Sequence, residues 1–325
     1  MSTMRAVIVD PAAPGRLTVG PAEAPSPGAG EALVRVAAMS LNPGELRNRA
    51  RLSRPGWRPG RDFAGTVEQA AADGSGPAAG TRVVGLVDGG TFAELVAVRP
   101  SALATLPPEV SFAQAATLPV AGLTALLALE RGGLLLGRDV LITGASGGVG
   151  HLACQLARAA GARVVGQVRQ PDRAAVAEAA GAHAVIVGDL PAAPPPGGTL
   201  PDSHAAEDYH LVLDSVGGET LAQALTLLAP GGTCVTFGAS AGSEATVNLN
   251  RFFLKGGTHL YGFYLFDELA RRPAGAELAR LAALVADGRL RPHIAVEASW
   301  TEIAARAQQL LDRDVVGKIV LHVTP

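Results

Sequence analysis

The sequence predicts an α/β protein that combines a doubly wound, parallel sheet of the Rossmann type with a second, β-rich domain. Two observations carry this prediction. Short apolar, β-branched runs separated by Gly, Pro and Asp fill the first hundred residues, whereas strand-like runs alternate with helical patterns after Ser111. Such an alternation favours a parallel sheet with right-handed crossovers. At 325 residues, the chain is also long enough for two separate cores.

The N-terminal part is predicted to be an irregular, mostly antiparallel β-domain. Gly, Pro or Asp bounds each of its apolar runs, and these residues favour turns. The expected strands are Arg5–Asp10, Glu31–Met39, Gly65–Ala71, Arg82–Val87 and Phe92–Val98.

The central part is predicted to hold the parallel sheet. Its first strand, Val140–Thr143, is a continuous apolar run, as expected of a strand buried on both faces. Further strands are expected at Arg163–Val168, Ala184–Val187, Leu211–Asp214, Thr233–Phe237 and Lys255–Phe266. Helices are expected at Val120–Arg131, Val149–Ala160, Asp172–Ala180, Glu219–Ala229 and Gly275–Asp287, before a final strand at Lys318–Val323. The Pro- and Gly-rich segment Gly188–Ala206 is expected to be a surface loop.

Composition narrows the class of protein. The net charge is −2 and no block of five Lys or Arg occurs, which counts against nucleic acid as a partner. Two cysteines, Cys154 and Cys234, suit a reducing compartment. The first ten residues lack the apolar core of a signal peptide, and no run of eighteen apolar residues suggests a membrane span. We therefore expect a cytoplasmic protein that acts on a small molecule.

A glycine-rich loop follows the first strand of the predicted sheet and opens a helix. At such a place the backbone can approach a pyrophosphate closely, and the helix N-terminus offers N–H groups and a positive dipole end. Compared with the Gly-x-Gly-x-x-Gly pattern, Ala145 replaces the first glycine, and a tight turn without a ligand is the alternative. The candidate cofactor contacts are Gly144, Ser146, Gly147, Gly148, Val149 and Gly150.

The end of the second strand indicates which dinucleotide is bound. NAD enzymes usually place a carboxylate there to bind the ribose 2′-hydroxyl. Here the strand is followed by Arg169, with Arg173 four residues later. Two guanidinium groups favour a 2′-phosphate, so NADPH is the expected cofactor. The alternative is that both are ordinary solvated surface arginines.

Six motifs occur in an order that resembles one known family, and the resemblance extends over nearly the whole chain. They are Leu41-Asn42-Pro43, Gly60–Gly65, Leu118–Ala125, Gly144–Gly150, Leu213–Gly218 and Gly317–Leu321. In this respect the chain resembles the zinc-free quinone oxidoreductase branch of the medium-chain dehydrogenase/reductase superfamily. The resemblance implies a GroES-like catalytic domain at 1–115, completed by 266–325, and a Rossmann domain at 116–265.

The resemblance raises the question of zinc. A catalytic zinc needs three protein ligands, usually Cys, His or carboxylate. The first hundred residues contain neither Cys nor His, and Asn42 and Asp62 stand at positions that resemble those of the ligands in zinc-dependent relatives. Cys154 falls inside a predicted helix, where a small buried side chain is the expected role. We therefore expect no metal.

Without zinc, the resemblance implies hydride delivery from NADPH to a quinone or an enone rather than alcohol oxidation. Asn42 is expected beside the nicotinamide ribose, although a turn residue before Pro43 is an equal alternative. Tyr264 is the candidate proton donor, with packing or water as alternatives. The other contacts that the resemblance implies are Thr124, Gly238, Ala239, Ser240, Phe263 and Lys318.

Two other functions remain open at this point. One is reduction of an enoyl thioester or a polyketide-derived enone in a biosynthetic pathway. The other, from a different class, is an NADPH-binding protein with no physiological turnover. The cofactor motif alone does not separate them.

The predicted last strand of the sheet suggests self-association. Its apolar centre, Leu260–Phe266, carries neither charge nor proline, although an outermost strand exposes unpaired backbone groups. A second copy, paired across a two-fold axis, would cover it, so a homodimer is expected. The alternative is a strand covered within its own chain.

Overall fold

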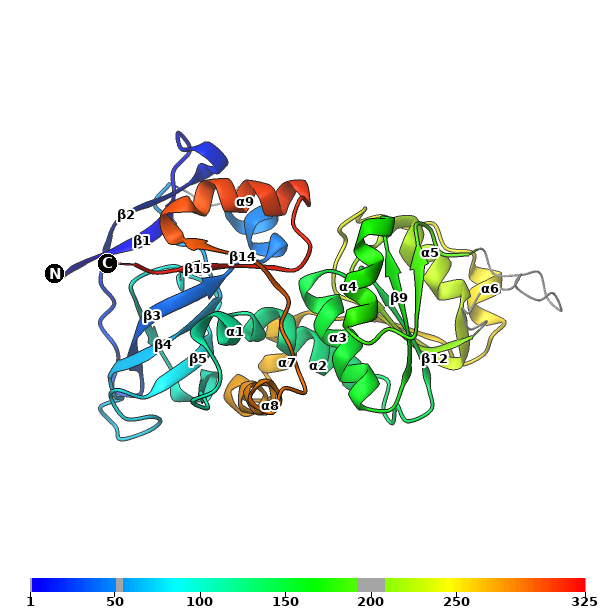
Figure 1. The fold of residues 1–325 in the computed structure, drawn as a ribbon, viewed down its shortest axis with the longest axis horizontal. Coiled ribbons are helices and arrows are strands. Elements are labelled where there is room, and N and C mark those ends of the chain that lie inside the picture. Colours follow the sequence, from blue (N-terminus) through cyan, green and yellow to red (C-terminus); the bar gives the residue numbers. More distant parts are fainter. Residues whose placement is uncertain (1, 51–54, 192–207, 325) are drawn as a thin grey trace. The chain divides into compact units, whose positions relative to one another are not determined.

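The computed structural model describes residues 2–50, 55–191 and 208–324, and the chain divides into two compact units (Figure 1). One unit comprises Met1–Leu123 and Leu269–Pro325, and the other comprises Thr124–Glu268. Most of the predicted loop Gly188–Ala206 lies outside the described residues. None of the helices in the described part is long and apolar enough to span a membrane.

The first unit is built on a seven-stranded sheet with a separate hairpin. The sheet order is β14-β15-β3-β4-β5-β7, and β6 pairs with β3; all pairs are antiparallel except β14 with β15. The sheet strands are β3 (Ala32–Ser40), β4 (Asp62–Gln69), β5 (Arg82–Leu86), β6 (Leu95–Val98), β7 (Leu103–Thr105), β14 (Ile294–Ser299) and β15 (Lys318–His322). The hairpin joins β1 (Thr3–Val9) to β2 (Leu17–Glu23). The expected antiparallel β-domain is thus present.

Short helices complete the first unit. They are α1 (Phe112–Ala116), α8 (Ala274–Ala286) and α9 (Ile303–Asp312), with single turns that include η2 (Glu45–Ala50) and η4 (Leu118–Gly122). Helix α9 packs its apolar face on a core in which Trp300 is fully buried against residues of β1, β3 and β15. The C-terminal segment is therefore an integral part of this unit.

The second unit is a parallel sheet with the doubly wound order. The order is β10-β9-β8-β11-β12-β13, and every neighbouring pair is parallel. The strands are β8 (Asp139–Thr143), β9 (Arg163–Val168), β10 (Ala184–Val187), β11 (Tyr209–Asp214), β12 (Leu228–Thr236) and β13 (His259–Gly262). The helices are α2 (Leu123–Glu130), α3 (Gly148–Ala159), α4 (Ala174–Ala179), α5 (Gly218–Thr226), α6 (Leu249–Phe253) and α7 (Leu265–Leu269). From β8 the chain adds β9 and β10 on one side of the sheet and then β11, β12 and β13 on the other. Rossmann folds bind their ligands at this switch point between β8 and β11.

Some elements differ from the sequence-based expectation. Within the predicted strand Lys255–Phe266, only His259–Gly262 forms strand β13. A turn precedes it, and α7 already begins at Leu265. The predicted helix Glu219–Ala229 ends at Thr226, since β12 already begins at Leu228. Strand β2 was not expected, because Gly20 and Pro21 interrupt its apolar pattern. It tolerates Pro21 because β1 is its only partner in the two-stranded sheet.

Candidate functional site

The carboxyl edge of the parallel sheet gathers most of the predicted cofactor contacts. Gly144–Gly150 follow β8, Arg169 follows β9, Gly238–Ser240 lie just beyond β12, and Phe263 follows β13. Because all these strands run in parallel, their carboxyl ends lie along one edge. The structure therefore brings these four groups together, although they are spread over 120 residues of sequence.

The glycine loop makes a tight passage from β8 into α3. Gly144 has φ +63°, and the N–H of Gly147 donates to its carbonyl oxygen at 2.9 Å. A Cβ added at Gly150 would lie 2.3 Å from the same oxygen, so only glycine fits there. Gly147 is the N-cap of the twelve-residue helix α3 and is exposed. The first N–H groups of this helix are thus available to an anion.

Two residues that the sequence analysis missed hold this loop in place. Gln167 of β9 accepts from the N–H of Gly144 at 3.2 Å and donates to the carbonyl oxygen of Gly188 at 2.7 Å. Asp214, at the end of β11, accepts from Thr143 at 2.8 Å and from the N–H of Gly217 at 3.0 Å. Burial raises the pKa of Asp214, and these hydrogen bonds oppose the rise. Together these two side chains fix the loop at the ends of three strands.

The remaining predicted residues of the second unit show a range of environments. Arg169 is exposed and Arg173 is half-buried in a short turn after β9. Thr124 is buried in α2, and Phe263 is buried with its ring edge-on to Phe237, 6.5 Å between centroids. The side chain of Tyr264 is exposed. The loop presents glycine backbone at the start of α3, which fits the pyrophosphate of a nicotinamide dinucleotide.

A buried polar cluster lies in the first unit and contains two of the predicted site residues. Its members are Asn42, Glu45, Asp62 and Lys318, all less than 8% exposed. The Asn42 amide donates to Asp62 at 2.8 Å and to Glu45 at 3.1 Å, and its oxygen accepts from Lys318 at 2.7 Å. Lys318 also donates to the carbonyl oxygen of Leu41 at 2.9 Å. Asn42 is therefore the centre of a polar network rather than a simple turn residue.

Burial controls the charges of this cluster. It raises the pKa of Glu45 to about 8, and the neighbouring charge of Asp62 adds to the rise. Burial also raises the pKa of Asp62, against the opposing effect of Lys318. Asp62 faces Lys318 at 3.8 Å and accepts from Val120 N–H at 2.8 Å, whereas one oxygen of Glu45 has no hydrogen-bond partner among the residues that the structure describes. At neutral pH the proton therefore resides on Glu45, while Asp62 and Lys318 form an ion pair.

This set of donors does not fit a catalytic zinc. The ammonium of Lys318 stands against both Asn42 and Asp62, where it would repel a metal cation. An amide oxygen with two carboxyl groups, those of Glu45 and Asp62, also lacks the thiolate and imidazole ligands that zinc usually has. Across residues 2–50, 55–191 and 208–324, no three His, Cys, Asp or Glu side chains form a metal-binding group.

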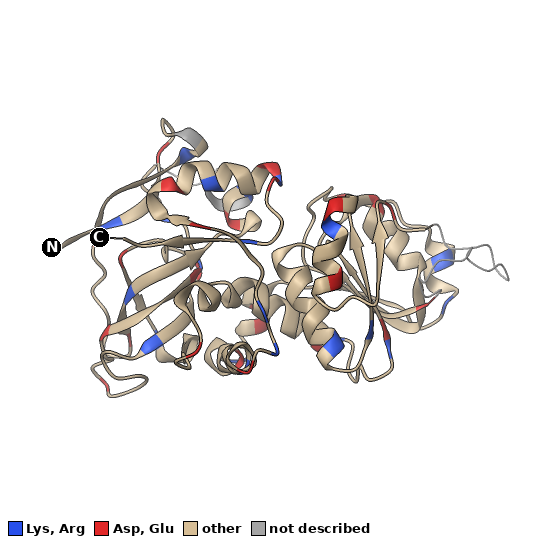
Figure 2. Ribbon diagram, in the orientation of Figure 1, with Lys and Arg blue, Asp and Glu red and all other residues tan. Residues whose placement is uncertain are grey.

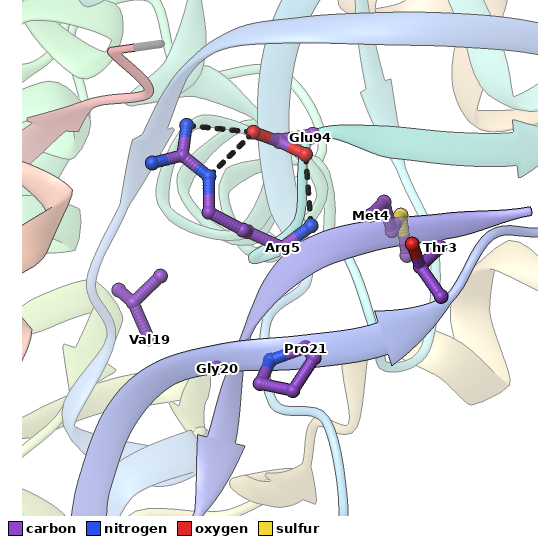
Figure 3. A pocket seen from close by; sticks show the side chains of 7 residues that line it. All are labelled: Thr3, Met4, Arg5, Val19, Gly20, Pro21 and Glu94. Atoms are coloured by element: carbon purple, nitrogen blue, oxygen red, sulfur yellow. Dashed lines mark hydrogen bonds and ion pairs between the residues drawn. The ribbon is translucent and has the colours of Figure 1, made fainter.

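A surface hollow on the β1–β2 hairpin lies apart from all predicted site residues. It is lined in part by Arg5, Val19 and Glu94 (Figure 3). Arg5 and Glu94 form an ion pair at 2.7 Å, so they satisfy each other. The hollow therefore offers no unsatisfied charge to a ligand.

Elsewhere on the ribbon, acidic and basic residues are interspersed in both units (Figure 2).

Two family models match the chain, one in each half. Residues 28–108 match the alcohol dehydrogenase GroES-like domain, and residues 148–282 match the zinc-binding dehydrogenase domain.

Curated relatives include several reductases. The chain is 31% identical to the quinone oxidoreductase of Pseudomonas aeruginosa over 91% of this chain and 92% of that protein. It is 32% identical to the acryloyl-coenzyme A reductase of Metallosphaera sedula over 71% of this chain and 65% of that one. It is 34% identical to the spectinabilin polyketide synthase system protein NorB of Streptomyces orinoci over 82% of this chain but only 12% of that protein.

Solved structures agree with this picture. The quinone oxidoreductase of Coxiella burnetii superposes with a TM-score of 0.81 at 26% identity, covering 99% of this chain and 100% of that one. A mycobacterial protein in complex with NADPH superposes with a TM-score of 0.82 at 27% identity, covering 98% and 100%.

Proposed function

The chain is an oxidoreductase of the quinone oxidoreductase branch of the medium-chain dehydrogenase/reductase superfamily, and from this premise we propose that it uses NADPH to reduce a quinone or an α,β-unsaturated carbonyl compound without zinc. The observation that carries the proposal is the glycine loop at the switch point of the sheet, beside strand β9, which is followed directly by Arg169 rather than by a carboxylate. The donor set around Asn42, which does not fit zinc, supports the metal-free part.

The chain's own residues would have separate roles in cofactor binding and in proton transfer. Bound NADPH would supply the hydride. The N–H groups at the start of α3 would hold the pyrophosphate, and Arg169 and Arg173 would hold the 2′-phosphate. Asn42 would contact the nicotinamide ribose, and Phe263 and Gly238–Ser240 would line the cofactor. Tyr264, whose side chain is exposed, is the proposed proton donor.

A turnover assay tests this function. Purified protein should oxidise NADPH when a small quinone or an enone is added, and the rate should survive exhaustive EDTA treatment. Tyr264→Phe should slow the enone reaction if the tyrosine supplies the proton. A stoichiometric zinc content that tracks activity would contradict the metal-free proposal. NADPH binding without oxidation of any acceptor would favour a binding protein instead.

The cofactor preference has its own prediction. Arg169→Asp should weaken NADPH binding by roughly 1–3 kcal/mol, because a charge-assisted contact is lost and repulsion replaces it. NADH carries no 2′-phosphate, so its binding should change far less. Fluorescence titration with both cofactors measures this, and Arg158→Asp on the surface of α3 serves as a charge-matched control. Equal affinity of the unmodified protein for NADH and NADPH would refute the assignment.

A second candidate substrate class is an enoyl thioester. It is favoured by the relatives, since one is named an acryloyl-coenzyme A reductase and another belongs to a polyketide synthase system. Acryloyl-coenzyme A, which is both an enone-like acceptor and a thioester, should be included in the assay. A kcat/KM for the thioester well above that for quinones would assign the protein to this class.

We also propose a homodimer through strand β13. This strand is the edge of the parallel sheet, and its residue Leu260 is 48% exposed. Tyr261 is a poor probe, because its hydroxyl donates to Glu268 at 2.5 Å and its ring lies under Arg131. Leu260→Asp should instead halve the mass measured by light scattering, since it places charge on the proposed interface. A monomer mass for the unmodified protein at micromolar concentration would end this proposal.

A further inference from the structure

Lysine is rare in this chain. Of its 27 basic residues only two are lysines, Lys255 and Lys318. Lys255 lies at the surface beside Asp208, whereas Lys318 is 5% exposed at the start of β15. Of the two lysines, only Lys318 is therefore buried. An ammonium is a small point charge, whereas a guanidinium is a wide planar fork that needs more space.

The Lys318 ammonium contacts three oxygen-bearing groups that together stabilise its positive charge. It donates to the side-chain oxygen of Asn42 and the carbonyl oxygen of Leu41, and it faces the Asp62 carboxylate at 3.8 Å. Burial lowers the pKa of Lys318, and the neighbouring Asp62 carboxylate opposes this fall, so the ion pair favours the charged ammonium. Arg61 and Glu45 are the other ionisable groups near this pair.

The same contacts fix the amide of Asn42. Its two N–H groups are used by Asp62 and Glu45, and one lone pair of its oxygen is used by Lys318. An amide has two donor hydrogens and two acceptor lone pairs. Only one acceptor lone pair is left, so Asn42 can accept a hydrogen bond from a ligand but cannot donate one.

We propose that Lys318 supplies a fixed positive charge beside Asp62 and that, as a positioning residue, it holds Asn42 as an acceptor for a ligand hydroxyl. A ribose hydroxyl of the cofactor fits this acceptor, whereas an enolate oxygen does not. The inference rests on the proposed function only for the identity of that hydroxyl.

A measurement on the full chain tests the cation without using activity. Protein labelled with ¹⁵N and ¹³C in lysine alone gives two side-chain signals, and Lys255→Arg assigns them. The Lys318 signal should be that of a charged ammonium at pH 7.5, shielded from solvent exchange. It should not change when excess zinc is added. A neutral amine, or displacement of the signal by zinc, would overturn the proposal.

A double-mutant cycle tests the positioning role. Asn42→Ala and Lys318→Met should each raise the NADPH dissociation constant about tenfold, the scale of one hydrogen bond, and the double variant should be no weaker than either single one. Binding is measured on the folded fraction. A dissociation constant raised about a hundredfold in the double variant, the product of the two single effects, would overturn the positioning role. If Lys318→Met does not fold, the labelled full-length protein still decides the central claim. Failure of the unmodified protein to bind NADPH would refute the proposed function while leaving the lysine measurement intact.

Discussion

Gly150→Val is expected to abolish detectable NADPH binding and to destabilise the parallel-sheet unit. Any Cβ at this position would lie 2.3 Å from the carbonyl oxygen of Gly144 and 2.8 Å from Cα of Ala145, so backbone must move. Forced overpacking of this kind typically costs roughly 1–3 kcal/mol, and backbone contacts this short place the cost near the upper end. The loop that moves is the one proposed to hold the pyrophosphate, so we expect the dissociation constant to rise at least about a hundredfold. Titration calorimetry and thermal unfolding measure the two effects.

Gly147→Ala is the matched comparison. A Cβ at Gly147 would lie 3.2 Å from the same oxygen of Gly144, and Gly147 has an ordinary φ of −79°. Stability should therefore change little, while the methyl group on the exposed N-cap hinders close approach of a phosphate. The two variants separate folding from binding. If Gly150→Val unfolded at the same temperature as the unmodified protein, the steric argument for this glycine would be wrong.

The sequence predicted the parallel-sheet unit well because its signals are local. Strands β9 and β10 begin and end at the expected residues, since each is a short apolar run between clear breakers. The glycine loop lies where it was expected, between β8 and α3. In each case a few neighbouring residues contain the information, and the strand–helix alternation supplies the topology.

The buried cluster of the first unit could not be found in the same way. Asn42 and Lys318 are 276 positions apart, and their contact exists only because β15 pairs with β3. Glu45 was not singled out from the sequence, and only its spacing from Asn42 gave a signal, because side chains three apart in a helical turn can meet. Strand β14 and helix α9, which complete this unit from the C-terminus, were missed for a related reason. Their patterns are amphipathic but short, and long-range packing decides them.

The charge of Glu45 predicts how stability depends on pH. Its pKa is about 8 in the folded protein, against 4.5 as the ordinary value, because it is buried beside Asp62. Between these two values the folded form keeps a proton that the unfolded form has released. The free energy of unfolding must then fall as pH rises through this window, by up to about 1.4 kcal/mol per pH unit. Stability from this group is complete below about pH 4.5 and is lost by about pH 8.

Glu45→Gln should remove this dependence. Glutamine keeps the oxygen that accepts from Asn42 but cannot ionise, so the two proteins should be similarly stable near pH 5. At pH 8.5 the Gln variant should be more stable, by on the order of 4 kcal/mol at most. Both tryptophans, Trp57 and Trp300, lie in the first unit, so urea unfolding followed by their fluorescence reports on this unit alone. Glu302→Gln, which removes a surface carboxylate paired with Arg306, is the matched Glu-to-Gln control. A Glu45→Gln effect that stays constant with pH would mean that Glu45 is ionised in the folded protein, and that the buried cluster carries one more negative charge than we infer.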